Sequence, residues 1–449
     1  MTRPVREWNV DQSMLLPLSV HDFVPSDHVA HFIRDTVAEE LDLSAVWQAY
    51  GGDRGQPPYH PAMMTALLLY AYCQGIYASR RIAAACEQRV DFMAVTGMER
   101  PDFRTISDFR KQHLQALEGL FVQVLALCQQ AGLARLGHVA LDGTKVAANA
   151  SKHKAMSYAR LQREEQRLAA EVEGWFEAAD AADGEDDAAF GDVRGDELPA
   201  WAADRQQRLD RIRAAKEALE AEAAEAAEAE TRAASAGDAE DDDDDPDPPS
   251  APPRHHDDGT PADKAQRNFT DPDSRVMLTR SGWMQAYNAQ IAVDADHQVI
   301  VGQMLTPCAV DINHLAPMVA AIERDAGHVP DELSADAGYC SEANLEYLNR
   351  NAIRGYVATG RGHHDQPTAT GDRAPDPDSF TGQMETRLRR GGWRSRYRLR
   401  KILAEPVIGQ IKHARGFRQL LLRGLDQAKG EWSLMCTAHN LMKLAKAAA

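Results

Sequence analysis

The chain has 449 residues, of which 44% are hydrophobic and 26% are charged, so it has the apolar material for a large core and the length of two to four domains. Its formal net charge is −18, but residues 161–260 alone contain 31 acidic and 10 basic residues. Residues 387–429, in contrast, contain 13 Lys or Arg and only two acids. The overall acidity therefore does not exclude a polyanionic partner such as DNA, because a strongly basic segment lies elsewhere in the chain.

Membrane proteins and disulfide-stabilised secreted proteins do not fit the sequence. The longest apolar run, residues 62–73, is much shorter than the ~20 residues of a membrane-spanning helix. The first residues lack the apolar core of a signal peptide. The six cysteines are scattered and form no Cys-x-x-Cys pair. We expect a cytoplasmic protein with reduced cysteines.

Residues 1–135 are predicted to be helical, because apolar residues recur three and four positions apart in three successive segments. Thr105 or Ser107 is the predicted N-cap of the third segment, and Gly132 is its predicted end. The Arg and Lys side chains of these helices either contact DNA phosphates or form an ordinary solvated helix face.

The next part of the chain contains a predicted strand, a predicted pair of helices and a segment that is predicted to be disordered. Residues 138–148 are apolar and β-branched, which predicts a strand. Residues 155–232 are rich in Ala, Glu, Arg and Gln, which favours a projecting antiparallel pair of helices. Residues 233–265 are rich in Asp and Pro and are predicted to be disordered. The insertion at 156–265 is either a solvated spacer or an element that makes dimer contacts or shields the basic segment.

From residue 284 onward, short apolar runs alternate with helical periods, which predicts an α/β domain. Together with residues 138–148 they predict a mixed sheet of about five strands with flanking helices. The predicted strands are 284–294, 297–306, 332–338 and 354–360, the first two joined by a tight turn, and the predicted helices are 313–327, 342–351, 398–420 and 429–447.

Two aspartates occupy strand positions where this residue type is unfavourable. Asp142 lies in the middle of VALDGTKV, and Asp336 lies in LSADAGY, at the carboxyl end of its predicted strand. A buried carboxylate needs a hydrogen-bond shell, a cation or a metal ion. The alternatives are that Asp142 and Gly143 form a turn, and that Asp336 simply ends a strand.

The third acid, Glu405, lies in the basic segment. On a helix, Lys401, Glu405 and Lys412 share nearly one face, as in a surface ion-pair ladder, although Pro406 predicts that the helix begins or bends there. Two strand aspartates and a helical glutamate also form an oxygen-only ligand set of the kind that Mg²⁺ prefers. Three such carboxylates with two Mg²⁺ ions would suit phosphodiester cleavage, and the nearby Arg and Lys would neutralise phosphates.

The sequence resembles the DDE transposases of bacterial insertion sequences, in the subgroup with a Tyr-Arg-Glu-Lys signature. The resemblance extends over nearly the whole chain outside the insertion. It is carried by PDFRTISDFRKQH (101–113), LDGTKVAANASKHKA (141–155), DPDSRVM (271–277) with AYNAQIAVD (286–294), SADAGY (334–339), YRLRKILAEPVIGQIKHARGFRQLLLRGL (397–425) and EWSLMCTAHNLMKL (431–444).

The resemblance implies an RNase H-like catalytic core that uses two Mg²⁺ ions, with Mn²⁺ as a substitute, to cleave transposon ends and join them to target DNA. Asp142, Asp336 and Glu405 take the catalytic and metal-binding positions. The implied DNA-binding residues are Tyr397, Arg400, Lys401, Lys412, Arg415 and Arg418. The implied organisation is a helical DNA-binding domain (1–135), the first part of the core (136–155), the insertion (156–265) and the rest of the core (266–449), acting as a homodimer on transposon-end and target DNA.

The sequence departs from the family pattern in two ways. The signature places three residues between its Arg and its Glu, which fits Lys401, whereas the distance from Tyr397 fits Arg400, so either residue could fill this position. The long insertion follows the first strand, whereas better-known relatives carry theirs before the glutamate helix. Trp283 and Trp393 could stack on flipped bases or simply pack at a rim. The competing functions are an RNase H-like nuclease without strand transfer and a catalytically silent DNA-binding relative.

Overall fold

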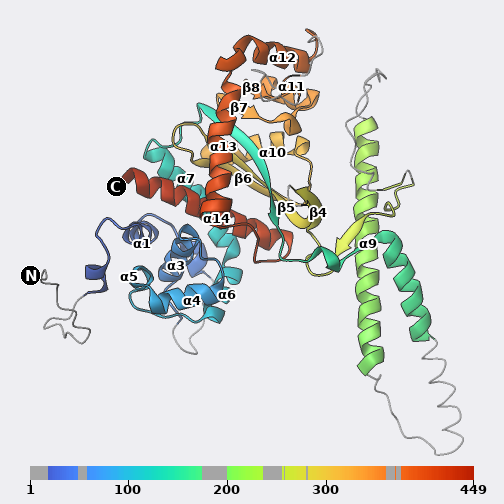
Figure 1. Cartoon of the computed structure of the whole chain (residues 1–449), viewed down its shortest axis with the longest axis horizontal. Helices are drawn as coiled ribbons and strands as arrows, with labels where there is room; N and C mark the ends of the chain where they lie inside the picture. Colours follow the sequence, from blue (N-terminus) through green and yellow to red (C-terminus); the bar gives the residue numbers. More distant parts are fainter. Residues whose placement is uncertain are drawn as a thin grey trace, which may run out of the picture.

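The structure, a computed structural model, describes residues 19–48, 58–173, 200–235, 255–256, 258–279, 282–360, 370 and 376–448. It contains a group of N-terminal helices, a mixed sheet with flanking helices, and an arm of two long helices that projects from the side (Figure 1). No helix in these ranges combines the length and the apolar character that crossing a membrane requires.

The N-terminal part is helical, as predicted. Its central helix α3 is buried along almost its whole length, which explains its unbroken apolar sequence. The predicted N-cap of α6 is wrong, because the cap is Asp102, whose side chain accepts hydrogen bonds from the backbone N–H groups of Arg104 and Thr105. The predicted end at Gly132 is confirmed, since α7 stops at Gln130 and Gly132 has a φ of +74°. The helices are α1 Val29–Glu39, α2 Ser44–Trp47, α3 Pro61–Cys73, α4 Ser79–Gln88, α5 Val90–Thr96, α6 Phe103–Gln112 and α7 Leu114–Gln130.

The sheet is mixed and has six strands. Its order is β4-β5-β1-β7-β8, and β6 pairs with β5 as well. The strand β1 is antiparallel to β5 and parallel to β7, which is parallel to β8. The strands are β1 His138–Ala147, β4 Arg275–Thr279, β5 Gly282–Asp294, β6 Ile300–Thr306, β7 Glu332–Ala335 and β8 Arg354–Val357.

This sheet confirms the predicted strands and corrects two details. Hydrophobic periodicity did not predict β4, which pairs with the first residues of β5, although the family resemblance implied a hairpin of residues 271–277 with 286–294. The connection between β5 and β6 is not a two-residue turn, because Asp294 and Val299 pair across it and β6 begins only at Ile300. The helices α10 Leu315–Ala326 and α11 Glu342–Arg350 lie where the sequence predicted them.

The basic segment forms α12 Phe380–Gly391, α13 Leu399–Gly409 and a π-helical turn, Gln410–Ala414. The long last helix, α14 Leu425–Ala448, packs against α7 and α3 on one side and against β6 on the other. The buried side chain of Asn440 donates to and accepts from the backbone of Ile300, so it pairs with the edge of β6 as a neighbouring strand would. One hydrophobic core therefore joins the N-terminal helices to the sheet.

The predicted helical pair forms the arm, with helical residues 158–173 packed against α9 Ala200–Ser235 (Figure 1). It has its own small hydrophobic cluster, which includes Leu161, Leu168 and Ile212. At its base, β2 Ala155–Ser157 pairs with β3 Gln266–Asn268.

The disorder predicted for residues 233–265 does not hold at either end of that range. The helix α9 continues to Ser235, and residues 258–265 form backbone hydrogen bonds. The rest of this range, 236–254 and 257, lies outside the described residues, as do residues 174–199 between the two helices.

The cysteines agree with the prediction of reduced thiols. All six are free, and Cys73, Cys86, Cys128 and Cys436 are buried.

Candidate active site

Asp142 lies within a continuous strand, so the alternative of an Asp-Gly turn is wrong. It pairs with Ile291 of β5 in the antiparallel register, and only 8% of the residue is exposed. The glycine that follows it has a steric role, because a Cβ atom at Gly143 would lie 2.4 Å from the Nε2 atom of Gln290. The strand therefore carries Asp142 into the interior next to a position where the backbone of β1 packs closely on β5.

Asp336 follows β7 directly and lies beside Asp142. The parallel register pairs Ala140 with Ser334, and each aspartate comes two residues after its member of this pair. The carboxylate of Asp336 also caps a short 3₁₀ turn, because its Oδ1 atom accepts a hydrogen bond of 3.0 Å from the N–H of Gly338. The two aspartates therefore lie side by side, just beyond the point where the pairing of β1 with β7 ends.

Glu405 lies on α13, which packs across β1, β5 and β7. The helix neither begins nor ends at Pro406, which lies inside it. Proline cannot donate to the carbonyl four residues earlier, and here the carbonyl of Ile402 accepts a hydrogen bond from Gln298 instead, at 3.1 Å. This contact satisfies the carbonyl that proline leaves free, so the helix continues past Glu405.

The guanidinium of Arg400 joins the three acids. Its Nη1 atom lies 2.9 Å from Asp142 Oδ2 and 4.0 Å from Asp336 Oδ2, and its Nη2 atom lies 3.4 Å from Glu405 Oε1. The Nε atom of Arg400 is buried and has no hydrogen-bond partner. Carboxylates that are far apart in the sequence therefore converge on one buried cation.

Burial changes the protonation of the two aspartates. Desolvation raises the pKa of Asp142 to about 6, against the opposing effect of Arg400 and with a further increase from the charge of Asp336. Desolvation also raises the pKa of Asp336, again opposed by Arg400. The site therefore concentrates negative charge that needs a compensating cation at neutral pH.

The donor set fits a hard divalent cation. All three side chains offer carboxylate oxygen, which is the ligand type that Mg²⁺ and Mn²⁺ bind in proteins, and all three surround one positive group. Among the described parts of the chain, no three His, Cys, Asp or Glu residues lie close enough together to hold a metal ion as they stand. The Arg400 guanidinium lies between the carboxylates, so binding of an ion requires this side chain to move.

The other predicted site residues surround this cluster at different depths. Tyr397 is half-buried against the core, whereas Lys401 is exposed. Lys412 donates from its Nζ atom to Thr144 Oγ1 at 2.6 Å and to the carbonyl of Lys145 at 2.5 Å, both on β1. The pKa of Lys412 is lowered to about 8, mainly by burial and also by the nearby charges of Arg418 and Lys145.

Arg415 and Arg418 differ in their environments. Arg418 is exposed and donates from Nε to the carbonyl of Lys412 at 3.1 Å. Arg415 is half-buried; its guanidinium contacts His439 at 3.3 Å, and its carbonyl accepts a hydrogen bond from Tyr77 of the N-terminal helices. Arg415 therefore connects the basic segment to the helices beneath it. Trp283 and Trp393 are more than half exposed, so neither is a packed core residue.

The sequence reasoning missed a polar layer beneath the two aspartates. Asp311 accepts hydrogen bonds at Oδ1 from Asn288 at 2.6 Å and from Gln290 at 2.8 Å, and Lys145 lies 3.5 Å from the same atom. Tyr339, three residues after Asp336, donates to Gln290. The fully buried Asn288 and Gln290 inside the apolar strand β5 were the available signal, because buried amides need partners.

Comparison with known protein families identifies two regions of this chain. Residues 18–112 match the family described as a transposase domain (DUF772), and residues 374–445 match the family described as a transposase DDE domain. No curated protein and no solved structure matches the chain. The second match contains Arg400 and Glu405, and the first covers most of the N-terminal helices. Together, the two matches support an insertion-sequence DDE transposase, with the DDE region on the helix that completes the acidic cluster.

Proposed function

We propose that the protein is a DNA transposase that cleaves the terminal inverted repeats of an insertion sequence with Mg²⁺ and joins the ends to target DNA. The observation that carries this proposal is the convergence of Asp142, Asp336 and Glu405 on one guanidinium, all within 4.0 Å. These acids come from β1, the end of β7 and α13, and the sheet with flanking helices is compatible with an RNase H-like core.

In this proposal the three carboxylates hold two divalent ions once Arg400 has moved. The bound ions would activate a water or a 3′-hydroxyl and stabilise the leaving oxygen. Burial of Asp142 excludes water from one side of the cluster and fixes its carboxylate on a rigid strand.

The cations around the cluster would bind phosphates. Lys412 is anchored on β1 two residues from Asp142, and Lys401 and Arg418 are exposed in the same segment. We propose Arg400, rather than Lys401, for the basic position of the Tyr-Arg-Glu-Lys signature, because only Arg400 contacts the acids. A planar guanidinium also suits bidentate contact with a phosphate. As in the family that the chain resembles, two copies would act together on paired ends.

The proposal is tested with the full-length chain and a DNA fragment that carries the inverted repeats bracketing its coding region, in the presence of Mg²⁺ and a target plasmid. We expect nicking at the repeat ends and capture of these ends in the plasmid. Asp142→Asn and Asp336→Asn should each lose at least about a thousandfold in rate, because each removes a metal ligand.

The matched control is Asp331→Asn. Asp331 is exposed and precedes β7, the strand that Asp336 follows, so its replacement should leave the rate unchanged. Cleavage without capture would indicate a nuclease without strand transfer. DNA binding without any metal-dependent cleavage would indicate a catalytically silent relative, and an Asp142→Asn variant that cleaves at the normal rate would overturn the proposed site.

A further inference from the structure

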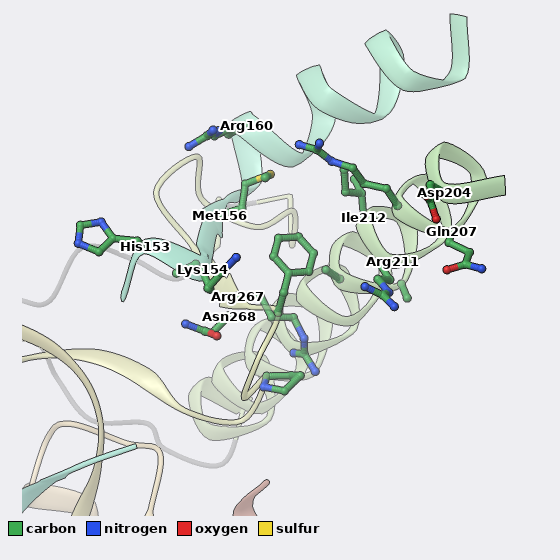
Figure 2. A pocket seen from close by; sticks show the side chains of 16 residues that line it. His153, Lys154, Met156, Arg160, Asp204, Gln207, Arg211, Ile212, Arg267 and Asn268 are labelled. Atoms are coloured by element: carbon green, nitrogen blue, oxygen red, sulfur yellow. The ribbon is translucent and has the colours of Figure 1, made fainter. Parts of the chain in front are cut away.

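The base of the arm contains a basic pocket that none of the catalytic residues lines. It lies between residues 153–160, the first half of α9 and residues 267–272, and has a volume of about 790 Å³ (Figure 2). We refer to it as the arm pocket. Its cationic lining consists of Lys154, Arg160, Arg208, Arg211 and Arg267, and Asp204 is the one acid among the residues that line it.

The charge of α9 is segregated along its length. Residues 204–216 contain five Lys or Arg and two Asp, whereas residues 217–230 contain six Glu and no basic residue. The arm pocket is lined by the basic half. The insertion is acidic overall but has a local positive surface, because most of its acids lie in another part of α9 and in segments outside the described residues.

Three of the five cations form no close ion pair within the described residues, although the charge of Arg160 acts on the nearby Glu164. Arg208 lies 3.8 Å from Glu164, and Arg267 lies 2.5 Å from Glu222. Lys154, Arg160 and Arg211, in contrast, are exposed and form no ion pair with an acid that the structure describes. Arg160 and Arg211 come from different helices of the arm and both line the pocket (Figure 2). Five cations beside a single lining acid form a surface that favours an anion.

The rest of the lining suits a nucleic-acid strand rather than a small inorganic anion. Met156, Ile212 and Phe269 contribute apolar surface, and 37% of Phe269 is exposed. An aromatic ring beside a basic groove is the usual composition of surfaces that bind a DNA strand, because bases stack on the ring while cations neutralise the phosphates.

A second hollow lies next to the arm pocket. His153 lines both cavities, and the second one, about 1280 Å³, is also lined by Lys145 and Trp283. Lys145 forms the ion pair with Asp311 beside the catalytic aspartates. Lys145 and His153 therefore place basic side chains between the acidic cluster and the base of the arm, although Glu222 and Glu225 also line the second hollow.

We propose that the arm pocket binds the phosphodiester backbone of DNA that extends away from the active site, with Arg160 and Arg211 as phosphate contacts. This inference rests on the proposed function, because it assigns the arm to the same DNA substrate. It gives the insertion a role other than that of a spacer: the arm anchors DNA outside the catalytic cluster.

The test uses the full-length chain and measures the affinity for a fluorescently labelled 30-base-pair duplex and a 30-nucleotide single strand at several salt concentrations. Arg160→Glu and Arg211→Glu are the pocket variants. Each should weaken binding about 5–10-fold at ~0.1 M salt and reduce the slope of log K against log salt by about one, which is the loss of one phosphate contact.

The matched control is Arg163→Glu. Arg163 is exposed on the same helix as Arg160, three residues later, and does not line the pocket. Its replacement changes the net charge by the same amount, so it should alter affinity by less than about twofold. Circular dichroism of all three variants verifies that the arm remains helical.

The outcomes separate the two proposals. If both pocket variants bind DNA as Arg163→Glu does, the arm pocket is not a DNA site, whereas metal-dependent cleavage by the unchanged chain still supports the transposase. If the unchanged chain binds neither DNA probe at low salt, both proposals are wrong. A loss of affinity in the pocket variants alone, with an unchanged slope for the control, supports the arm pocket.

Discussion

The guanidinium of Arg400 donates a hydrogen bond of 2.9 Å to the Oδ2 atom of Asp142, 258 residues earlier in the chain. Both side chains are nearly buried, with 12% and 11% of their surface exposed. The pair crosses from α13 to the central strand, so it fixes the glutamate helix against the sheet. Arg400 therefore holds the acidic cluster together where a divalent ion would otherwise neutralise it.

In the proposed site, Arg400 and Mg²⁺ compete for the same three carboxylates. Replacing Arg400 by Gln should reveal this competition. Without Mg²⁺, we expect the free energy of unfolding to fall by about 1–3 kcal/mol, because a buried carboxylate loses its cation. Mg²⁺ should then bind about tenfold more tightly than in the unchanged chain, since no guanidinium has to leave. Calorimetric titration with Mg²⁺ and urea denaturation, with and without the ion, measure both effects.

Lys401→Gln is the control for this prediction. It removes the same charge from the adjacent residue, which is exposed and forms no ion pair with the three acids. Mg²⁺ affinity and stability should stay close to those of the unchanged chain. Equal Mg²⁺ affinity in the two variants would show that Arg400 does not compete with the ion.

DNA affinity should depend on pH through Lys412. Burial lowers the pKa of Lys412 to about 8, so the side chain is a cation below this pH and becomes neutral as the pH rises through it. We expect the affinity for a duplex to fall by about 5–10-fold between pH 7 and 9, the loss of about one phosphate contact. In Lys412→Arg the guanidinium stays charged, so the decrease should disappear.

Lys401→Arg provides the comparison for the pH series, because Lys401 is exposed in the same segment. This variant should show the same decrease above pH 8 as the unchanged chain. Fluorescence anisotropy at constant ionic strength measures all three proteins. A decrease that persists in Lys412→Arg would assign it to another group.

The sequence singled out the three acids that the structure brings to one guanidinium, but it did not specify their arrangement. Asp142 and Asp336 stood out because each interrupts an apolar strand, and the parallel register of β1 and β7 places them side by side. The choice between Arg400 and Lys401 depended on the rotation of α13 relative to the sheet, which spacing along the chain does not specify. Contacts between residues that are far apart in the sequence determine how such a helix is rotated against the sheet.

Other differences between prediction and structure have local causes. The strand β4 has no clear alternating pattern, because only Met277 of its five residues is buried while Leu278 is exposed, and it pairs only with the first residues of β5. The N-cap of α6 lies earlier than predicted because Thr105 and Ser107 are N-cap residue types too, whereas Asp102 is the one whose side chain accepts from the first backbone N–H groups of the helix. The basic half of α9 was overlooked because net charge was summed over the whole insertion rather than along the helix.

The buried Glu431 should be essential for the attachment of the basic segment. Its Oε2 atom accepts hydrogen bonds from the N–H groups of Leu421 at 2.8 Å and Leu422 at 3.0 Å, and its Oε1 atom accepts one from Tyr72 at 3.2 Å. Glu431→Ala leaves these donors unpaired, so we expect a loss of about 3–5 kcal/mol in the free energy of unfolding.

Urea denaturation measures this loss, and Glu431→Gln serves as the conservative comparison. The amide keeps the shape and one acceptor oxygen, so it should lose about half as much. The exposed Glu323 on α10 provides the control, since Glu323→Ala should change stability by less than about 0.5 kcal/mol. A similar small loss for Glu431→Ala would mean that the segment is held by other contacts.

The helices α14 and α7 pack closely at Gly430. A Cβ atom at Gly430 would lie 2.4 Å from the Cγ atom of Leu114, so Gly430→Ala should cost about 1–3 kcal/mol through overpacking. Gly119→Ala, on the facing helix α7, should be neutral or stabilise the chain by up to about 1 kcal/mol, because nothing lies within 4 Å of the added atom.

The same position allows a compensating change. Leu114→Ala removes the side chain that clashes, so in the double variant Gly430→Ala should cost less than it does alone, by about 1 kcal/mol or more. Thermal denaturation of the two single variants and the double variant completes the cycle. If the stability changes of the two single variants add strictly in the double variant, the two helices separate to accommodate the extra methyl group. The core shared by the N-terminal helices and the sheet would then tolerate added volume at this position.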